Sequence, residues 1–392
     1  MIKKRHLIIA VAVTFVVTSI LYNLLVMNIT RREMTEDPVM TAKKLILSDY
    51  VDKLTDEQIA KLNDAAIDAM VKELGDPYSR YMSASDFENY KEEHEEDYIG
   101  IGIEIVFDTE EETMIVLSPY SGSPAQRAGI IPGDIITEVD GIAVNATSYD
   151  KIISHIRGEG AEEGAKVKIK VKRKDKDDEI EIEVIRERVE IQTVSFEKLE
   201  DNIGYIKIAE FKNRTAEEFT AALETLKDME ISSLIIDLRN NPGGYAHTVI
   251  SMCDMLLPEG IIAYLEDSEG QRKYFNSDAK ELGLPMAILI NGGTASASEL
   301  LAGSVQAYGL GTVIGEKSYG KAVGQSVYEI EGNSALYLTN SRYFTPKGDC
   351  IDGKGITPDI EIKLSDEKFV RLGLLEKEED DQLMAAIETL TK

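Results

Sequence analysis

Residues 291–325 read NGGTASASELLAGSVQAYGLGTVIGEKSYGKAVGQ, and the interpretation of the rest of the chain depends on this stretch. The apolar run Met286–Ile290 before it predicts a buried strand, and residues 299–307 predict a helix with apolar side chains at helical spacing. Ser296 lies in the turn between them, where the unpaired N–H groups at a helix start can stabilise a developing oxyanion. Lys321 follows after a further short strand, in a second glycine-flanked turn. We therefore expect Ser296 and Lys321 to lie side by side at one end of a sheet.

The residues of both turns resemble the carboxyl-terminal processing proteases, also called tail-specific serine proteases. The resemblance is carried by residues 293–299 (GTASASE), by Gly320 and Lys321, and by Gln325. It implies that Ser296 is the nucleophile, that Lys321 is the general base and that Gln325 orients the lysine. Taken alone, Ser296 would be a helix N-cap and Lys321 a solvated loop lysine. The combination of residues favours catalysis.

A second glycine-rich turn lies upstream, at residues 239–244 (RNNPGG), directly after the apolar run 233–238. A glycine pair between a strand and a helix exposes backbone N–H groups, which suits an oxyanion hole, although an ordinary turn has the same pattern. The family has a similar Asp-Leu-Arg-x-Asn-Pro-Gly-Gly segment. The resemblance therefore implies that Gly243 donates to the oxyanion together with Ala297, and the choice between Gly243 and Gly244 stays open.

Composition excludes some classes of function. The 392 residues are enough for two or three domains, and the net charge of −28 argues against binding to nucleic acid or to anionic lipid headgroups. The cysteines, Cys253 and Cys350, have no metal-ligand spacing, and we interpret both as packing residues. The four histidines are scattered. We predict no metal and no cofactor.

Residues 7–27 carry no charged side chain and could cross about 30 Å of hydrocarbon as a helix. Lysine and arginine residues at positions 3–5 precede this run, which favours a cytoplasmic N-terminus. A cleaved signal peptide is the alternative, but it would have a shorter apolar core and a small-residue cleavage site after it. We predict a single transmembrane anchor in the cell membrane, with the catalytic part outside the cytoplasm.

Residues 95–188 change to short strands and turns. A segment that alternates glycine with apolar residues is followed by SPAQRAG at 123–129, and together they resemble a PDZ domain with a second helix at 148–156. The glycines would let backbone N–H groups cradle the terminal carboxylate of a peptide, which could pair with the adjoining strand. A plain β-domain that acts as a spacer is the alternative. The predicted peptide-binding residues are Tyr98, Ile99, Gly100, Ile101, Gly102 and Ile103.

The remaining segments complete the predicted fold class, an α/β protease core with an inserted PDZ β-domain. The resemblance implies that this core is crotonase-like. Thr55 and Thr215 predict helix starts by capping-box spacing, and residues 76–79 (DPYS) match the family but are assigned no chemistry. The tail has an apolar face that could pack against the body or a second subunit. The predicted parts are the cytoplasmic segment and anchor at 1–36, a helical segment at 37–94, the PDZ domain at 95–188, the α/β serine protease core at 189–365 and a helical tail at 366–392.

These features predict a membrane-anchored serine endopeptidase that cleaves protein or peptide substrates near their free C-termini. The PDZ domain would bind the substrate tail, gate the site, or both. Lys321 must be neutral to act as a base, so we expect burial to lower its pKa, with uncharged Gln325 accepting a hydrogen bond from the amine. Two alternatives are a Ser–His hydrolase that uses His247 and a catalytically inactive PDZ scaffold. A homo-oligomer is compatible with the sequence.

Overall fold

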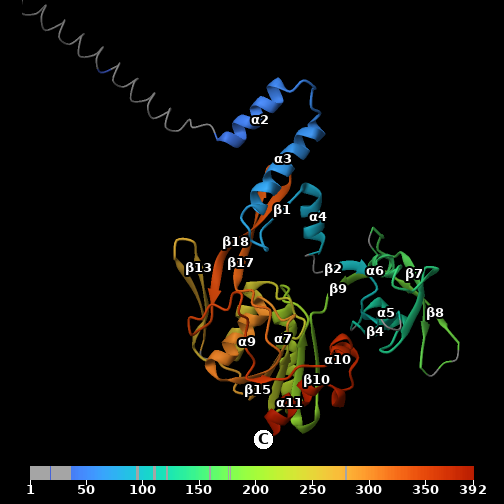
Figure 1. Ribbon diagram of the computed structural model, residues 1–392. Coiled ribbons are helices and arrows are strands. Elements are labelled where there is room, and N and C mark those ends of the chain that lie inside the picture. The colour runs from blue at the N-terminus through green and yellow to red at the C-terminus, as the bar shows by residue number, and fades with distance from the viewer. Residues whose placement is uncertain are drawn as a thin grey trace, which may run out of the picture. The chain divides into compact units, whose positions relative to one another are not determined.

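The structure is a computed structural model that describes residue 18 and residues 37–93, 97–108, 112–120, 122–158, 160–174, 176, 178–278 and 280–392 (Figure 1). The chain divides into two compact units, Met1–Glu73 and Leu74–Lys392. The transmembrane helix predicted at residues 7–27 lies outside the described residues, except for residue 18. Within the described ranges, no helix is long and apolar enough to span a bilayer.

The described part of the first unit is helical, as predicted. It contains α2 (Pro38–Asp49) and α3 (Asp56–Lys72). The predicted capping box at the start of α3 is confirmed: the Gln58 N–H donates to Thr55 Oγ1 at 3.3 Å, and the Thr55 N–H donates to Gln58 Oε1 at 2.8 Å. This pair satisfies backbone groups that a helix start leaves free.

The segment with the PDZ pattern forms a β-domain in the second unit. Its core is a cluster of buried aliphatic side chains between the main sheet and α6 (Tyr149–Arg157), which lies where the second helix is predicted. A short helix, α5 (Pro124–Ala128), follows the N-cap Ser123. A separate two-stranded ladder joins β2 (Asp97–Gly100) to β9 (Glu187–Glu190). The main sheet has the order β3 (Ile103–Asp108), β4 (Thr113–Pro119), β5 (Ile135–Val139), β7 (Lys166–Lys172) and β8 (Ile180–Ile185), with β6 (Ile142–Ala143) paired to β5.

The α/β core is built on a six-stranded sheet whose central strands are parallel. Only β10 and β11 pair in antiparallel fashion. All five residues of β12 and of β15 are buried, because the sheet is covered on both faces, and this explains their continuous apolar runs. The order is β10 (Val194–Lys198), β11 (Ile203–Ile208), β12 (Ser233–Asp237), β15 (Met286–Ile290), β16 (Gly311–Gly315) and β19 (Ile360–Glu361).

Helices cover the two faces of this sheet. One face packs in a single cluster with α7 (Thr215–Asp228), α8 (Ala246–Leu256) and α9 (Ala297–Tyr308). The other face packs against α11 (Asp381–Thr391), whose Ala386 is fully buried. The predicted helical tail therefore packs against the chain's own sheet. It also contains α10 (Asp366–Val370) and the short 3₁₀ turns Leu372–Leu374 and Lys377–Glu379, and a third 3₁₀ turn (Glu200–Asn202) precedes β11.

The predicted cap at Thr215 is wrong by one position. Arg214 is the N-cap of α7 and makes no side-chain cap bond, whereas Thr215 is already helical and buried. Its hydroxyl accepts from the Lys212 N–H at 2.9 Å, and the carboxylate of Glu218 accepts from the Thr193 N–H at 2.8 Å instead of capping the helix. Contacts with neighbouring segments have replaced the local cap.

An antiparallel sheet completes the second unit. Its first strand, Arg80–Met82, lies in a segment predicted to be helical, and that part of the prediction is wrong. The strand forms because it pairs with β18, with Arg80 opposite Tyr337, and α4 (Ala84–Glu93) follows it. The order is β1 (Arg80–Met82), β18 (Ser334–Phe344), β13 (Gly260–Asp267) and β14 (Arg272–Ser277), with β17 (Val323–Ile330) also paired to β18. The domain boundaries given above stay predictions.

Candidate active site

The glycine-rich turn at 239–244 and the Ser296 turn follow neighbouring parallel strands, β12 and β15. Because β12 pairs with β15, the loops after their carboxyl ends meet at one edge of the sheet. Hydrogen bonds join the loops: the Ala295 N–H donates to the Asn241 carbonyl at 3.0 Å, and the Asn240 N–H donates to Asn291 Oδ1 at 2.9 Å. The Thr294 hydroxyl donates to the Leu238 carbonyl at 2.8 Å. These polar links give the Ser296 turn and the glycine-rich turn fixed relative positions.

Ser296 has an unusual backbone conformation. Its φ is 57° and its ψ is −115°, a region that costs a residue with a side chain about 1–3 kcal/mol. The residue directly precedes α9, and its N–H donates to Glu299 Oε2 at 2.8 Å. The strained turn thus places the Ser296 side chain at the start of the helix, beside the N–H of Ala297. No described residue accepts a hydrogen bond from that N–H.

Glu299 links the serine turn to the lysine turn, a role that we did not predict. Its side chain is fully buried. Oε2 accepts from the N–H groups of Ser296 and Lys321, both at 2.8 Å. Oε1 accepts from the Gly320 N–H at 2.7 Å and from the Ser318 hydroxyl at 2.5 Å. One buried carboxylate with four donors therefore fixes the backbone of both candidate catalytic residues.

Burial lowers the pKa of Lys321 below its usual 10.5, as a general base requires. The charge of Arg80 acts in the same direction, and the carboxylate of Asp76 opposes both. The Lys321 ammonium lies 4.9 Å from the centre of the Tyr78 ring. Asp76 and Tyr78 belong to the DPYS segment, so this segment contributes directly to the surroundings of the lysine. The sequence analysis assigned this segment no chemistry, and its match to the family was the signal that could have indicated its position at the site.

Gln325 is close to the other site residues but makes a different contact from the predicted one. It follows a register shift in β17, and its Oε1 accepts from the Tyr337 hydroxyl at 3.4 Å. Its Nε2 is buried, and none of the described residues accepts a hydrogen bond from it. A half-turn of the amide would exchange these two atoms and free an acceptor, so the orienting role of Gln325 stays a prediction.

The two glycines of the upstream turn differ. Gly243 has a φ of 103°, and its N–H donates to Asn241 Oδ1 at 2.9 Å. A β-carbon at this position would lie 2.8 Å from Ser296 Cβ, so a side chain there would displace the serine turn. Gly244 lines the pocket described below, and no described residue accepts from its N–H. The predicted oxyanion hole pairs Gly243 with Ala297. Gly244 is the alternative to Gly243, because its N–H is not used by another described residue.

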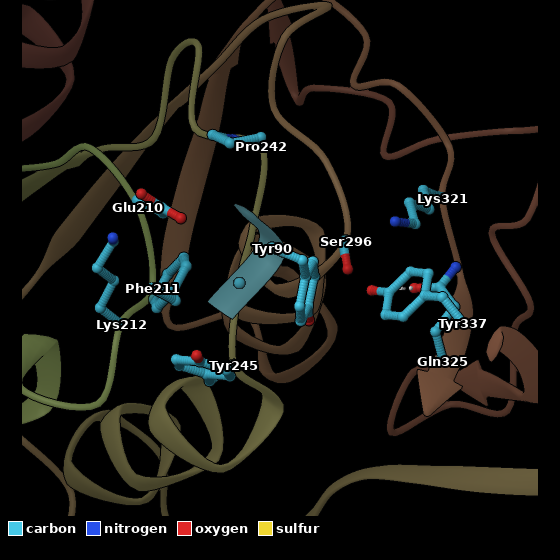
Figure 2. Close-up of a pocket in the computed structure, with 11 residues that line it drawn as sticks. Tyr90, Glu210, Phe211, Lys212, Pro242, Tyr245, Ser296, Lys321, Gln325 and Tyr337 are labelled. Carbon is cyan, nitrogen blue, oxygen red and sulfur yellow. Dashed lines mark hydrogen bonds between the residues drawn. The ribbon is translucent and has the colours of Figure 1, made fainter. Parts of the chain in front are cut away.

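One pocket of about 130 Å³ contains the candidate catalytic residues. Figure 2 shows the Ser296 hydroxyl and the Lys321 ammonium pointing towards the same space, with Lys212 and Glu210 on the opposite side. His247 does not line this pocket; it is exposed and stacks on Tyr245 with the ring centres 5.5 Å apart. The structure therefore gives the Ser–His alternative no support. The lining residues are Tyr90, Glu210, Phe211, Lys212, Pro242, Gly244, Tyr245, Ser296, Lys321, Gln325 and Tyr337.

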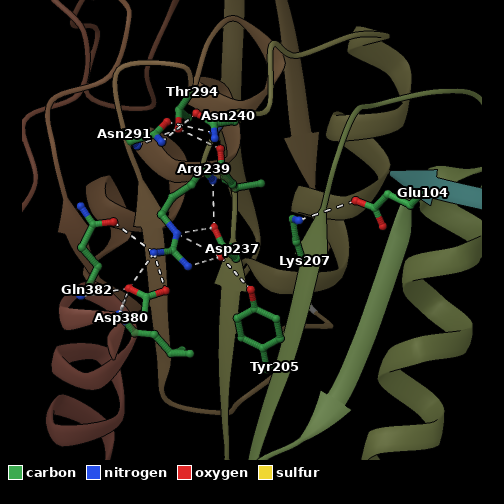
Figure 3. Close-up of polar contacts among 12 residues, drawn as sticks. Glu104, Tyr205, Lys207, Asp237, Arg239, Asn240, Asn291, Thr294, Asp380 and Gln382 are labelled. Atoms are coloured by element: carbon green, nitrogen blue, oxygen red, sulfur yellow. Dashed lines mark hydrogen bonds and ion pairs between the residues drawn. The ribbon is translucent and has the colours of Figure 1, made fainter. Parts of the chain in front are cut away.

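A buried ionic network lies at the base of the glycine-rich turn (Figure 3). Arg239 is 5% exposed and donates to Asp237 Oδ2 at 2.6 Å. On its other side it contacts Asp380 Oδ1 at 2.9 Å and Gln382 Oε1 at 3.1 Å, at the start of α11. Burial alone would raise the pKa of Asp237, but the charge and hydrogen bonds of Arg239 outweigh it and lower that pKa. The tail helix is therefore connected to the turn through a paired, buried guanidinium.

The predicted peptide-binding residues of the β-domain occupy two environments. Tyr98, Ile99 and Gly100 lie on β2, whereas the side chains of Ile101 and Ile103 belong to the domain core. A peptide could therefore meet Ile101 and Ile103 only through their backbone. Gly102 has a φ of 71°, and a β-carbon there would lie 2.6 Å from Ser123 Cβ, so the turn requires glycine.

Comparisons with known proteins agree with this architecture. Residues 202–362 match peptidase family S41, residues 98–184 match the PDZ domain, and residues 25–86 match the N-terminal domain of the activating protease CtpB. With the fold described above, these matches define a serine peptidase that carries a PDZ domain.

Similar proteins indicate which kind of serine peptidase the chain resembles. The probable CtpA-like serine protease of Staphylococcus aureus strain N315 is 33% identical over 359 residues, which cover 89% of this chain and 70% of the relative. The photosystem II D1 C-terminal processing protease has a similar structure, with a TM-score of 0.51 and 27% identity over 83% of this chain and 87% of that one. A putative S41 protease from Bacteroides fragilis shares the fold, with a TM-score of 0.61 and 17% identity over 89% of this chain and 96% of that one.

The chain belongs to peptidase family S41, among the CtpA-like serine proteases of the C-terminal processing type. The resemblance stated from the sequence is thereby confirmed, and the comparisons give no support to an inactive scaffold.

Proposed function

We propose that the chain is an endopeptidase that hydrolyses peptide bonds with Ser296 as nucleophile, Lys321 as general base and Gln325 as the residue that orients the lysine. The observation that carries this proposal is the geometry of the pocket. Ser296 and a lysine whose pKa is lowered by burial line one pocket, and Ala297 begins α9 directly after the serine.

The reaction follows from the chemistry of these groups. Neutral Lys321 accepts the proton of the Ser296 hydroxyl while Oγ attacks the carbonyl carbon of the scissile bond. The oxyanion that forms accepts hydrogen bonds from Ala297 and from one glycine of the upstream turn. The C–N bond then breaks, and the leaving amine takes the proton from Lys321. Water, deprotonated by the same lysine, hydrolyses the acyl-enzyme and restores Ser296.

Substitution of the nucleophile and the base tests this assignment. Ser296→Ala and Lys321→Ala should each lower kcat by at least about a thousandfold, as removal of a catalytic unit does in other serine proteases. Lys321→Arg should fail too, because a guanidinium stays protonated. Lys317→Ala, which removes an exposed lysine from the same segment, is the matched control. Turnover by Lys321→Ala within tenfold of the parent would exclude Lys321 as the base.

The orienting role of Gln325 has its own test. Gln325→Glu places a charge beside the lysine and should raise the pKa of Lys321, so that activity appears only at higher pH. Gln325→Ala should lower kcat without this displacement. An unchanged pH profile for Gln325→Glu would argue that residue 325 does not contact the amine.

The PDZ domain is proposed to bind the C-terminal tail of the substrate. Its match to the PDZ model and the turn at Gly102 support this role, because such turns offer backbone N–H groups to a terminal carboxylate. Binding there would raise the concentration of the substrate near Ser296 and could favour an active form of the enzyme. Amidation of the tail should slow cleavage, and deletion of residues 97–187 should remove that difference. Equal rates for free and amidated tails would exclude the reading of C-termini.

Residues 7–27 are proposed to anchor the protein in the cell membrane with its catalytic part outside the cytoplasm. The full chain should then fractionate with membranes, whereas a chain that starts at residue 35 should stay in the soluble fraction and still cleave peptides. An N-terminus found after residue 27 in protein isolated from cells would instead indicate a cleaved signal peptide.

A further inference from the structure

Lys212 is a charged side chain in the catalytic pocket that the mechanism does not use. It is 8% exposed and lines the pocket on the side opposite Lys321 (Figure 2). Among the described residues, none forms an ion pair or a side-chain hydrogen bond with its ammonium, and the same holds for the carboxylate of Glu210 nearby. A buried charge is normally paired or hydrogen-bonded. A negatively charged group bound in the pocket could therefore pair with the Lys212 ammonium.

The charge balance of the chain makes this arrangement unusual. Acidic residues outnumber basic ones by 71 to 43, so carboxylates are abundant partners for a lysine. Two arginines of the α/β core do pair with carboxylates. Arg214, two residues further on, pairs with Glu190 at 2.6 Å, and Arg239 pairs with Asp237 at 2.6 Å. Among the described residues Lys212 has no ion-pair partner, which points to a partner that arrives with the substrate.

The backbone of Lys212 is held firmly. Its N–H donates to the Thr215 hydroxyl at 2.9 Å, and its carbonyl accepts from the Thr248 hydroxyl at 3.0 Å. Both threonines are buried. Residues of two helices, α7 and α8, thus fix the backbone from which this side chain extends into the pocket wall.

We propose that Lys212 binds a carboxylate of the peptide substrate and so selects peptides with an acidic group close to the scissile bond. The inference rests on the proposed peptidase function of Ser296. Because an extended peptide advances about 3.3 Å per residue and both residues line one small pocket, the carboxylate should lie within about three residues of the bond that is cut. It can be the side chain of Asp or Glu or the α-carboxylate of the peptide, since a lysine pairs with either.

The test uses peptides of one core sequence, with Glu or Gln at each position up to three residues from the cleaved bond and with a free or an amidated C-terminus. For the full protein, kcat/KM should be about tenfold higher for the acidic member of one pair, the factor that a difference of about 1.4 kcal/mol gives. Lys212→Met should bring that ratio close to one. Lys212→Arg should keep it above one because the positive charge remains, and Lys227→Met, which removes an exposed lysine of α7, should leave the ratio as it is.

The peptide pair whose kcat/KM ratio falls to about one in Lys212→Met identifies the source of the carboxylate. Loss of the Glu/Gln preference assigns a side chain, and loss of the free/amidated preference assigns the peptide end. The same ratios should appear in Kd when binding is measured by fluorescence anisotropy with Ser296→Ala, which removes turnover from the readout. A preference that persists in Lys212→Met, or no preference in the full protein at any position, overturns the inference. Failure of the full protein to cleave any of the peptides would instead count against the proposed peptidase function.

Discussion

Two walls of one pocket differ in how their polar groups are satisfied. Ser296 and Lys321 line the candidate catalytic wall, and the buried carboxylate of Glu299, which does not line the pocket, accepts four hydrogen bonds that hold both turns. On the opposite wall, formed by Glu210 and Lys212, both charged side chains lack an ion-pair partner among the described residues. The contrast separates two tasks. Under the proposed function, groups that act on the scissile bond are fixed in advance, whereas groups that contact the rest of the peptide keep their bonding capacity for it.

The largest effect on kcat is expected when the hydrogen bonds that Glu299 accepts from the two turns are disturbed. Glu299→Gln keeps the size of the side chain but replaces one acceptor oxygen by an NH₂ group, which would face N–H donors of the two turns. We expect kcat to fall by about a hundredfold or more with little change in KM, because misplacement of catalytic groups by about 1 Å costs that much. Steady-state kinetics on a model peptide measures this effect.

The control for this change is Glu217→Gln, an exposed glutamate in the first turn of α7. It should leave kcat unchanged. Activity of Glu299→Gln within twofold of the parent would mean that the catalytic wall does not depend on this carboxylate, and the distinction between the two walls would fail.

The second prediction concerns stability and not kcat, because it removes Asp380, which supports the glycine-rich turn through Arg239. Asp380→Ala leaves buried Arg239 paired on one side only, and loss of one partner of a buried ion pair typically costs about 3–5 kcal/mol. Urea unfolding followed by circular dichroism should show this loss of stability. The neighbouring change Asp381→Ala removes an exposed pair with Lys368 and should cost less than about 1 kcal/mol. Equal costs for the two variants would contradict the proposed support.

The smallest effect concerns the pH profile. The carboxylate of Asp76 raises the pKa of Lys321, opposite to the effect of burial, so Asp76→Asn should lower that pKa further. More of the lysine is then neutral at a given pH, and the rise of kcat/KM with pH should move to lower pH. Asp86→Asn, at the start of α4, should leave the profile in place. A displacement to higher pH for Asp76→Asn would show that a group other than Lys321 controls the rise.

Much of the fold followed from patterns within short windows. The apolar runs at 233–238 and Met286–Ile290 predicted strands, and β12 and β15 are buried along their whole length. The positions of Ser296 and Lys321 followed because their turns come after strands, and both residues line the same pocket. A short apolar run is sufficient to predict a strand where the whole segment is buried.

The features that sequence reasoning missed depend on distant partners. Strand β1 exists because β18 pairs with it, and only the fold reveals that Lys212 has no ion-pair partner among the described residues. Glu299 had a signal that we did not use: the spacing Ser296-x-x-Glu299 is that of a capping box. Even so, its bonds to Gly320 and Lys321 join residues about twenty positions apart and could not be read from spacing.

The contact between Arg239 and Asp380 has a consequence for the time at which the protein can become active. These residues are 141 positions apart, and a ribosome makes them in that order. Ser296, Lys321 and Gln325 are therefore all present in the growing chain before the second partner of the guanidinium has been made. Until α11 folds onto the sheet, the glycine-rich turn rests on a half-paired charge. The order of synthesis thus delays completion of this turn until the tail helix has been made, and the growing chain contains the proposed nucleophile before the support of the turn is complete.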